Sequence, residues 1–272
     1  MAAEVLGIDS EKVRPIIADT SSIGYSLHTG GSRVTYSVGL AIIEAANNII
    51  ADLKQRAAKI WDIDVESVEW ENGMAIGRSQ ASISQGGQEE AEQMLTLSLK
   101  DIAGMAAKTG GPIASSVNIN ATGAGPGFGA HICDVEVDKE TGLVSILRYT
   151  AVQDVGKAIH PAYVEGQLQG GVAQGIGWAL NEEYIYNSDG KLTNSGFLDY
   201  RMPVASDLPM IDTVLVEVPN PKHPFGIRGV GEVCLVPVMA AVANAVYDAI
   251  GILPTSLPIS PPRLLKLIDE KK

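Results

Sequence analysis

The chain has 272 residues, a formal net charge of −12 and a pI near 4.8, and 46% of its residues are hydrophobic. A chain of this length and hydrophobicity can bury the core of one large domain or of two lobes, which excludes an intrinsically disordered protein. The acidic balance argues against a nucleic-acid-binding protein, because such proteins need a basic face for phosphates.

Hydrophobic runs and cysteine content indicate where in the cell the protein is expected. No run of 18 apolar residues is present, and the N-terminus lacks the basic and apolar regions of a signal peptide, so we expect no membrane span. The two cysteines, Cys133 and Cys234, cannot form a CxxC pair or a disulfide framework. We therefore expect a cytoplasmic protein. Cys234 is interpreted as a buried structural thiol, because no base accompanies it in the sequence.

The first part of the chain is dominated by one long expected helix. It runs from about Val34 to Trp61, because apolar residues recur at steps of three and four, with Val38 and Ile42 among the positions expected to be buried. Ser32 has the side chain of an N-cap for this helix. The other elements expected here are a glycine-capped helix end at residues 1–7, a buried strand at 13–18, a hairpin of 65–70 with 74–76, and a helix at 90–107.

The second part begins with a clear strand pair at residues 130–138 and 143–153, followed by a helix from Pro161 to Asn181. Further expected elements are short strands at 184–186 and 212–218, a helix at 237–250 and a short tail at 264–267. Because strands and helices do not alternate regularly, we predict an α+β fold with mixed sheets and packed helices in two lobes, residues 1–126 and 127–272. Residues 121–129 resemble a nucleotide-binding glycine pattern, but the strand–helix context of a regulatory nucleotide-binding domain is missing.

Glycine-rich segments carry the candidate chemistry. Glu232 follows Gly229 and Gly231 and precedes an apolar run, so we expect it where bare backbone approaches a ligand and where burial favours proton transfer. The alternative is a solvated glutamate in a surface turn. Residues 164–177 place five glycines in one expected helix, each costing up to about 1 kcal/mol relative to alanine. Such a cost is tolerated where another backbone or a ligand packs against the helix.

A second candidate lies at the start of the long helix. Gly30, Gly31, Ser32 and Arg33 precede its first turn, whose free N–H groups and positive partial charge suit a phosphate. The alternative is an ordinary capped helix. No spacing of histidine, cysteine and carboxylate residues suggests a protein-ligated metal, and His28 and His223 are expected on surface loops.

Three motifs in fixed order carry a family resemblance: residues 154–161, residues 164–177, and Gly229-Val230-Gly231-Glu232. Together they resemble the C-terminal cofactor-binding part of the large subunit of molybdenum hydroxylases, the xanthine dehydrogenase and aldehyde oxidase family. Residues 29–35, 127–142 and 197–209 fit the same pattern, so the resemblance covers nearly the whole chain.

The resemblance implies a molybdopterin cofactor with molybdenum, in the cytosine dinucleotide form, and hydroxylation of an aldehyde or an N-heterocyclic or aromatic carbon with oxygen from water. It implies that Glu232 is the general base and that the metal has no protein ligand. The residues that it implies for cofactor binding are Gly30, Gly31, Ser32, Arg33, Asp154, Val155, Gly156, Lys157, Ala158, Ile159, Gln167, Arg228, Gly229 and Gly231.

The chain departs from the family by what it lacks. The upstream half of the cofactor site, the cysteines for iron–sulfur clusters and a flavin domain are absent from these 272 residues. We therefore expect a split or truncated large subunit that works with a polypeptide supplying the N-terminal half, with subunits carrying 2Fe-2S clusters and FAD, and with a small-molecule substrate. The competing interpretation is a non-catalytic cofactor-binding or assembly module that keeps the fold but not the chemistry.

Overall fold

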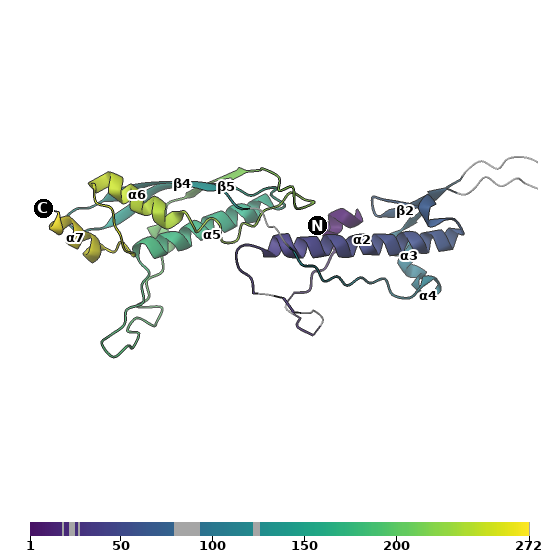
Figure 1. Ribbon diagram of the computed structural model, residues 1–272, viewed down its shortest axis with the longest axis horizontal. Helices are drawn as coiled ribbons and strands as arrows, with labels where there is room; N and C mark the ends of the chain where they lie inside the picture. Colours follow the sequence, from purple (N-terminus) through teal and green to yellow (C-terminus); the bar gives the residue numbers. More distant parts are fainter. Residues whose placement is uncertain (18, 22–24, 27, 79–92, 122–125, 272) are drawn as a thin grey trace, which may run out of the picture. The chain divides into compact units, whose positions relative to one another are not determined.

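The computed structural model describes residues 1–272 except 18, 22–24, 27, 79–92, 122–125 and 272. The chain forms two compact units: unit 1 contains Met1–Leu27 and Ser37–Ala121, and unit 2 contains His28–Tyr36 and Thr122–Lys272. Each unit combines helices with a three-stranded sheet (Figure 1), which confirms the α+β prediction. Residues 28–36, which were assigned to the first lobe from the sequence, belong to unit 2 in this division.

Unit 1 is built on most of α2 (Val34–Trp61) and a small antiparallel sheet of β1 (Glu69–Glu71), β2 (Met74–Arg78) and β3 (Met94–Ser98). The β1–β2 turn places Asn72 at φ 50° and Gly73 at φ 76°, as a two-residue hairpin requires. The remaining elements are α1 (Ala2–Leu6), η1 (Ser10–Lys12), η2 (Val65–Ser67), α3 (Leu99–Gly104) and α4 (Ala106–Thr109).

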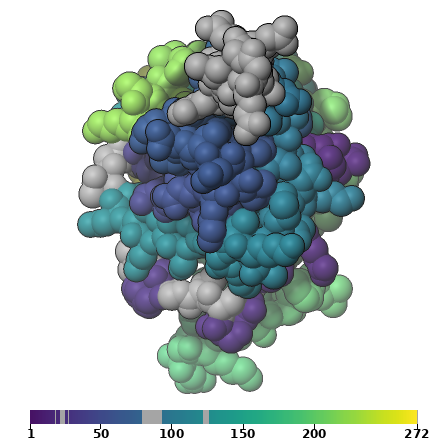
Figure 2. Space-filling view, turned by 90° about the vertical axis from the view of Figure 1, so that its right-hand side faces the viewer, coloured from purple at the N-terminus to yellow at the C-terminus, as the bar shows by residue number. Residues whose placement is uncertain are grey.

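The core of unit 1 lies where the C-terminal half of α2 meets the sheet and α3. Leu53, Ala57, Val68, Ala75 and Ile102 are buried there in one apolar cluster. In the space-filling view the segment around the end of α2 (blue) lies against the segment that follows β3 (teal) (Figure 2). Burial of this apolar surface is the main force that holds the short elements of unit 1 on α2.

Helix α2 has the predicted bounds, but its buried face is rotated near its start. Val38 and Ile42 are 48% and 36% exposed, whereas Ile43 and Ala46 are buried. By length and composition alone α2 could also cross a membrane, since an 18-residue window has a mean hydropathy of 1.3 and only 17% of it is buried. Core helices of soluble proteins pass the same test, so the absence of a membrane span stays a prediction.

Two sequence predictions in unit 1 are wrong, and the first strand of the expected hairpin is shorter than predicted, because residues 65–67 form η2. Among the described residues of the expected strand at 13–18, none is in a strand, and Ile16 and Ile17 are 76% and 86% exposed because no neighbouring strand pairs with them. The expected helix at 90–107 instead contains β3, followed by α3 and α4. Ser98 ends the strand and begins α3 by a capping box with Asp101. Residues 90–92 of that expectation lie outside the described residues.

Unit 2 contains a mixed sheet in the order β4–β5–β6, formed by β4 (Gly129–Val137), β5 (Val144–Asp154) and β6 (Ile211–Val216). The pair β4–β5 is antiparallel, as predicted, and β6 runs parallel to β5. A bulge between Asp134 and Val135 shifts the register. As a result, the buried side of β5 changes from Val144 and Ile146 to Tyr149, Ala151 and Gln153.

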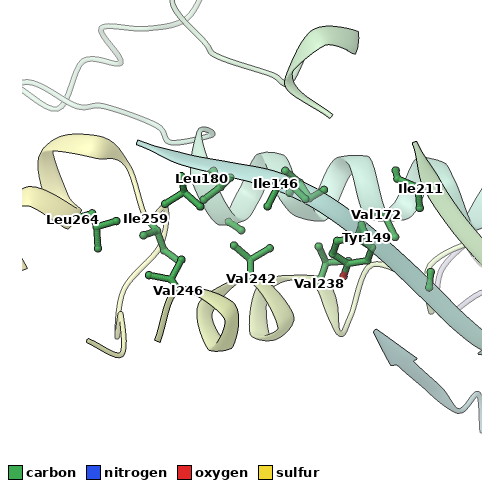
Figure 3. Packing of buried hydrophobic residues seen from close by; sticks show 14 of the residues in the cluster. Ile146, Tyr149, Val172, Leu180, Ile211, Val238, Val242, Val246, Ile259 and Leu264 are labelled. Carbon is green, nitrogen blue, oxygen red and sulfur yellow. The ribbon is translucent and has the colours of Figure 1, made fainter. Parts of the chain in front are cut away.

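Helices α5 (Pro161–Leu180) and α6 (Val238–Ile250) pack on this sheet and form the main core of unit 2 (Figure 3). Val172 and Ile176 of α5, Val238 and Val242 of α6 and Tyr149 of β5 belong to this one buried apolar cluster. Two predictions need correction: the strand expected at 184–186 is a single bridge between Tyr186 and Leu192, and the expected tail is a full helix, α7 (Pro261–Glu270). The remaining element is η3 (Ala205–Asp207).

Candidate functional site

Two loops of unit 2 that are far apart in the sequence are joined by Ser32 and Glu232. The backbone N–H of Ser32 donates to Oε2 of Glu232 at 2.8 Å. In return, the backbone N–H of Glu232 donates to Oγ of Ser32 at 2.7 Å. The glutamate expected to act as base therefore contacts the loop expected to bind phosphate. Glu232 is exposed, so the burial expected from its apolar neighbours is not observed.

Backbone conformation explains how these loops approach each other. Gly31 and Ser32 have φ angles of 64° and 57°, so the chain turns tightly before α2 begins. A Cβ atom at Gly229 would overlap the carbonyl oxygen of Ser32, so only glycine permits this contact. Ser32 does not adopt the extended conformation of an N-cap, which corrects that expectation.

A cavity of about 250 Å³ opens beside this junction. It lies at the N-terminus of α2, and both Arg33 and Arg228 line it. The helix N-terminus and the N–H donors of the two guanidinium groups suit an anionic ligand. The complete lining consists of Gly31, Ser32, Arg33, Tyr36, Pro126, Gly127, Asn220, Arg228, Gly229 and Val233.

Arg228 is fixed in the cavity wall by the predicted loop that starts at Asp154. Its Nε lies 3.0 Å from Oδ2 of Asp154, and both side chains are only 9% exposed. Its Nη1 donates to the carbonyl oxygen of Pro126 at 2.9 Å. Oδ1 of Asp154 accepts from the N–H groups of Gly156 and Val218. A buried carboxylate with these donors holds the arginine in place and balances its charge.

The rest of the 154–159 loop packs against the segment before Arg228. Gly156 has φ 66° and pairs with Ile227 in an isolated bridge, and a Cβ there would overlap the carbonyl oxygen of Gly226. Val155 N–H donates to the Val216 carbonyl at 2.9 Å. None of residues 154–159 is in the cavity lining. They act indirectly, by packing against the segment that carries Arg228, which does line the cavity.

Lys157 and Ala158 contact the carboxylate of Glu217 and do not line the cavity. Ala158 N–H donates to Glu217 Oε1 at 2.8 Å, and Lys157 Nζ lies 3.2 Å from Glu217 Oε2. The backbone hydrogen bond from Ala158, aided by that from Lys157, lowers the pKa of Glu217 below its usual value. Ile159 is 45% exposed. The predicted cofactor loop thus divides into a part behind the cavity and a part that pairs with Glu217.

Gln167 is brought towards the same junction by α5. Its Oε1 would lie 3.8 Å from a Cβ atom built on Gly231. Close packing places α5 there, since a Cβ at Gly171 would overlap Sγ of Cys234. Cys234 is fully buried, and its thiol donates to the Gln167 carbonyl at 3.1 Å. The burial predicted for Cys234 is confirmed, and this burial raises the pKa of its thiol.

The structure adds residues that the sequence did not single out. Tyr36, in the first turn of α2, and the buried Asn220 line the cavity, and only the position of Tyr36 just after the glycine loop could have indicated this. The prediction of a surface His223 is wrong: it is 3% exposed and packs against Tyr36, with ring centroids 5.3 Å apart. Its buried surroundings lower the pKa of His223.

No group of three or more histidine, cysteine, aspartate or glutamate side chains that could hold a metal is found within the described part of the chain. The site is therefore built from glycine-rich backbone, two arginines, a helix N-terminus and one glutamate. Such an arrangement is typical of sites that suit an anionic group, here with a carboxylate beside it.

Comparison with known proteins agrees with this class. The family model for the molybdopterin cofactor-binding domain matches residues 1–209, and the chain belongs to this family. It is 39% identical over 172 residues to the putative xanthine dehydrogenase molybdenum-binding subunit XdhA of Escherichia coli K12, covering 62% of this chain and 23% of the relative. It is 33% identical over 280 residues to the nicotine 6-hydroxylase large subunit of Paenarthrobacter nicotinovorans, covering 98% of this chain and 32% of the relative.

A solved structure gives the same result for the fold. The chain superimposes on quinoline 2-oxidoreductase from Pseudomonas putida 86 with a TM-score of 0.82 and 29% identity, covering 99% of this chain and 34% of that chain. The chain thus spans between about a quarter and a third of the length of these relatives. The resemblance seen in the sequence, to a molybdopterin-binding fragment of a molybdenum hydroxylase, is confirmed.

Proposed function

We propose that this chain is part of the catalytic subunit of a molybdenum hydroxylase and that Glu232 is its general base. The proposed reaction hydroxylates an aldehyde or an N-heterocyclic or aromatic carbon with oxygen from water. The observation that carries the proposal is the double hydrogen bond between Glu232 and Ser32, because it places a carboxylate at the edge of the cavity. The relatives supply the class of cofactor.

The cavity suits the anionic end of a molybdopterin, which we propose is bound in its cytosine dinucleotide form. Arg33, Arg228 and the N-terminus of α2 offer positive charge and N–H donors to a phosphate. A Cβ built on Gly31 would meet no atom within 4 Å, so the backbone there is open to a ligand. The chain's own residues therefore fit the group, and they would hold it through backbone N–H groups and arginine side chains rather than through metal ligands.

The bound cofactor would supply transfer of oxygen derived from water and acceptance of two electrons. The chain contributes the proton acceptor. Oε2 of Glu232 is held by the Ser32 N–H, so Oε1 is the atom that would take a proton from the water-derived hydroxyl. Gln167, close to Gly231, is placed to orient a polar group near the same carboxylate.

The relatives are longer than this chain, which spans about a third of their length. Since the chain covers 32% of one large subunit and 34% of a solved homologous chain, we propose a partner polypeptide that supplies the rest of the cofactor site. Subunits with 2Fe-2S clusters and FAD would carry electrons away. The location that we propose for this complex is the cytoplasm.

Replacing Glu232 by glutamine in the reconstituted complex tests the proposal. Glutamine keeps the shape and an acceptor oxygen but cannot take the proton, so turnover per bound molybdenum should fall by about 10²–10⁴-fold. Molybdenum content, measured by mass spectrometry, should stay unchanged. The exposed Glu136 of β4 provides the control, since Glu136→Gln should change neither quantity. Unaltered turnover in Glu232→Gln would exclude Glu232 as the base.

A second candidate is a non-catalytic cofactor-binding or assembly module. It is favoured by one observation: Glu232 is engaged with the backbone of Ser32, as a purely structural residue would also be. In that case Glu232→Gln should lower molybdenum content or thermal stability, while turnover per bound molybdenum stays the same. The ratio of turnover to molybdenum content separates the two candidates.

A further inference from the structure

We infer that Ser32 is a positioning residue for Glu232: one serine sets the place of the base and forms part of the cavity wall. The inference rests on the proposed function for its catalytic meaning, but the contact itself can be tested without it. Ser32 provides both a donor, its N–H, and an acceptor, its Oγ, to the same glutamate. We call this pair of hydrogen bonds the Ser32–Glu232 clasp.

Two hydrogen bonds in opposite directions restrict the glutamate more than either one alone. The bond to the Glu232 N–H fixes the backbone at the start of the side chain. The bond from the Ser32 N–H fixes Oε2 at its end. A glutamate side chain that is free in solution samples many rotamers, whereas one held at both ends keeps the carboxylate in a narrow range of positions.

The conformation of Ser32 points to a role for its hydroxyl group. Its φ of 57° lies in the left-handed region, where glycine is favoured and other residues are strained. The preceding Gly31 has a similar φ of 64°, so a second glycine would fit the turn with less strain. The serine hydroxyl gives a reason for the exception, because Oγ accepts the Glu232 N–H at 2.7 Å.

The clasp also connects the base to the binding wall. Ser32 lines the cavity, and Arg33 beside it donates from Nε to the carbonyl oxygen of His28 at 3.3 Å, which closes the loop. On the other side, Gly229 lies against the backbone of Ser32 with no room for a side chain. The loop that forms the cavity wall and the loop that carries Glu232 are therefore fixed to each other. As a result, a ligand in the cavity would lie at a constant distance from the Glu232 carboxylate.

The first test uses amide hydrogen exchange in the full chain, without cofactor or substrate. Ser32→Ala should speed exchange at the Glu232 amide by about 3–10-fold, because its acceptor is lost. Glu232→Ala should speed exchange at the Ser32 amide by a similar factor. Ser32→Gly removes the same hydroxyl while relieving the left-handed strain, so it should act like Ser32→Ala even if alanine perturbs the turn. Ser188→Ala, in an exposed turn of unit 2, should change neither amide.

The second test separates positioning from simple support. In the reconstituted complex, with aldehydes and N-heterocycles screened by dye reduction, Ser32→Ala and Ser32→Gly should lower kcat per bound molybdenum by about 10–100-fold with little change in KM. A merely structural serine would lower molybdenum content and leave kcat per bound molybdenum unchanged, and this result would overturn the inference.

The two tests also distinguish failure of the inference from failure of the proposed function. Unchanged exchange at both amides in the variants would show that the clasp does not form in solution, whatever the activity. If the unaltered complex turns over none of the screened compounds although it contains molybdenum, the proposed reaction fails. In that case the hydrogen-exchange data alone decide whether the Ser32–Glu232 clasp forms.

Discussion

At the scale of single residues, the buried ion pair between Arg228 and Asp154 explains how an arginine can lie in the cavity wall next to an apolar core. Both side chains are 9% exposed, and Nε of Arg228 makes no hydrogen bond among the described residues, so charge rather than alignment holds it to Asp154. The N–H groups of Gly156 and Val218 complete the environment of the carboxylate. A buried charge that loses its partner is costly, which makes this pair sensitive to substitution.

Replacing Arg228 by leucine should destabilise unit 2 by about 3–5 kcal/mol, because Asp154 would be left buried without its cation. Urea unfolding followed by circular dichroism measures this change. The exposed pair of Arg148 and Asp134, 2.8 Å apart, is the control, since Arg148→Leu should cost no more than about 1 kcal/mol. Equal effects of the two substitutions would contradict the assigned role of Arg228.

The buried His223 predicts a pH dependence of stability. Burial lowers the pKa of His223 in the folded chain, so the unfolded chain binds more protons near the ordinary histidine pKa of about 6.5. Stability should therefore be full above that pH and fall as the pH decreases from about 7.5 to 5.5. Urea midpoints across this range should drop less for His223→Gln, which cannot take up the proton. An unchanged slope would show that His223 does not contribute.

At the scale of elements, the glycines of α5 divide into two groups that the sequence could not separate. A Cβ at Gly175 would lie 2.5 Å from Cβ of Val238, and one at Gly171 would overlap Cys234, so these glycines let α6 and the loop that precedes it pack closely. At Gly166 and Gly170 nothing lies within 4 Å of such an atom. Gly177 is crowded as well, by Glu182 and Pro203, so close packing explains three of the five glycines, and Gly166 and Gly170 lie on an open face of the helix.

A matched pair of substitutions tests this division. Gly175→Ala should destabilise the chain by about 1–3 kcal/mol, because the added methyl group overpacks the α5–α6 contact. Gly170→Ala should instead stabilise it by up to about 1 kcal/mol, since alanine is the better helix former and the space is open. Thermal unfolding of both variants gives the comparison, and the same sign for both would contradict the packing described here.

A helix or strand could be predicted from the sequence where residues within the segment itself determine its structure. Apolar periodicity and turn residues within each segment determine the bounds of α2 and of the β4–β5 pair. The observed bounds therefore agree with the predicted ones to within a residue or so. Residues 13–17 have strand-like composition but no partner strand among the described residues, and β3 pairs with β2 across a long intervening segment. Pairing over such distances is decided by tertiary contacts, which local patterns do not contain.

The same distinction applies to the candidate site. The sequence indicated Glu232 and the Gly30–Arg33 loop as separate motifs, and their resemblance to a family connected them. The contact between Ser32 and Glu232, the ion pair of Asp154 with Arg228 and the burial of His223 all depend on residues far apart in the chain. No spacing rule could supply them. Lys157 and Ala158 were grouped with the site by their motif, yet they pair with Glu217.

At the scale of the whole molecule, the chain exposes large apolar side chains that a stable monomer would cover. Phe197 and Leu198 are 95% and 96% exposed, and Met210 is 85% exposed. The isolated chain should therefore bind hydrophobic dyes and self-associate, as measured by fluorescence and light scattering. The double substitution Phe197→Ser with Leu198→Ser should reduce both signals without lowering the unfolding temperature. If dye binding and self-association stay unchanged, the surface responsible for them does not include Phe197 and Leu198.

The central claim is that the cavity at the start of α2 holds the anionic part of a molybdopterin beside Glu232. An experimental structure of the chain in its complex, loaded with molybdenum cofactor, tests it most directly. The account predicts a cofactor phosphate within hydrogen-bond distance, about 3 Å, of the Ser32–Arg33 backbone or of Arg228, with the Glu232 carboxylate facing the metal. A cofactor bound away from this cavity, or a Glu232 turned away from the metal, would contradict it.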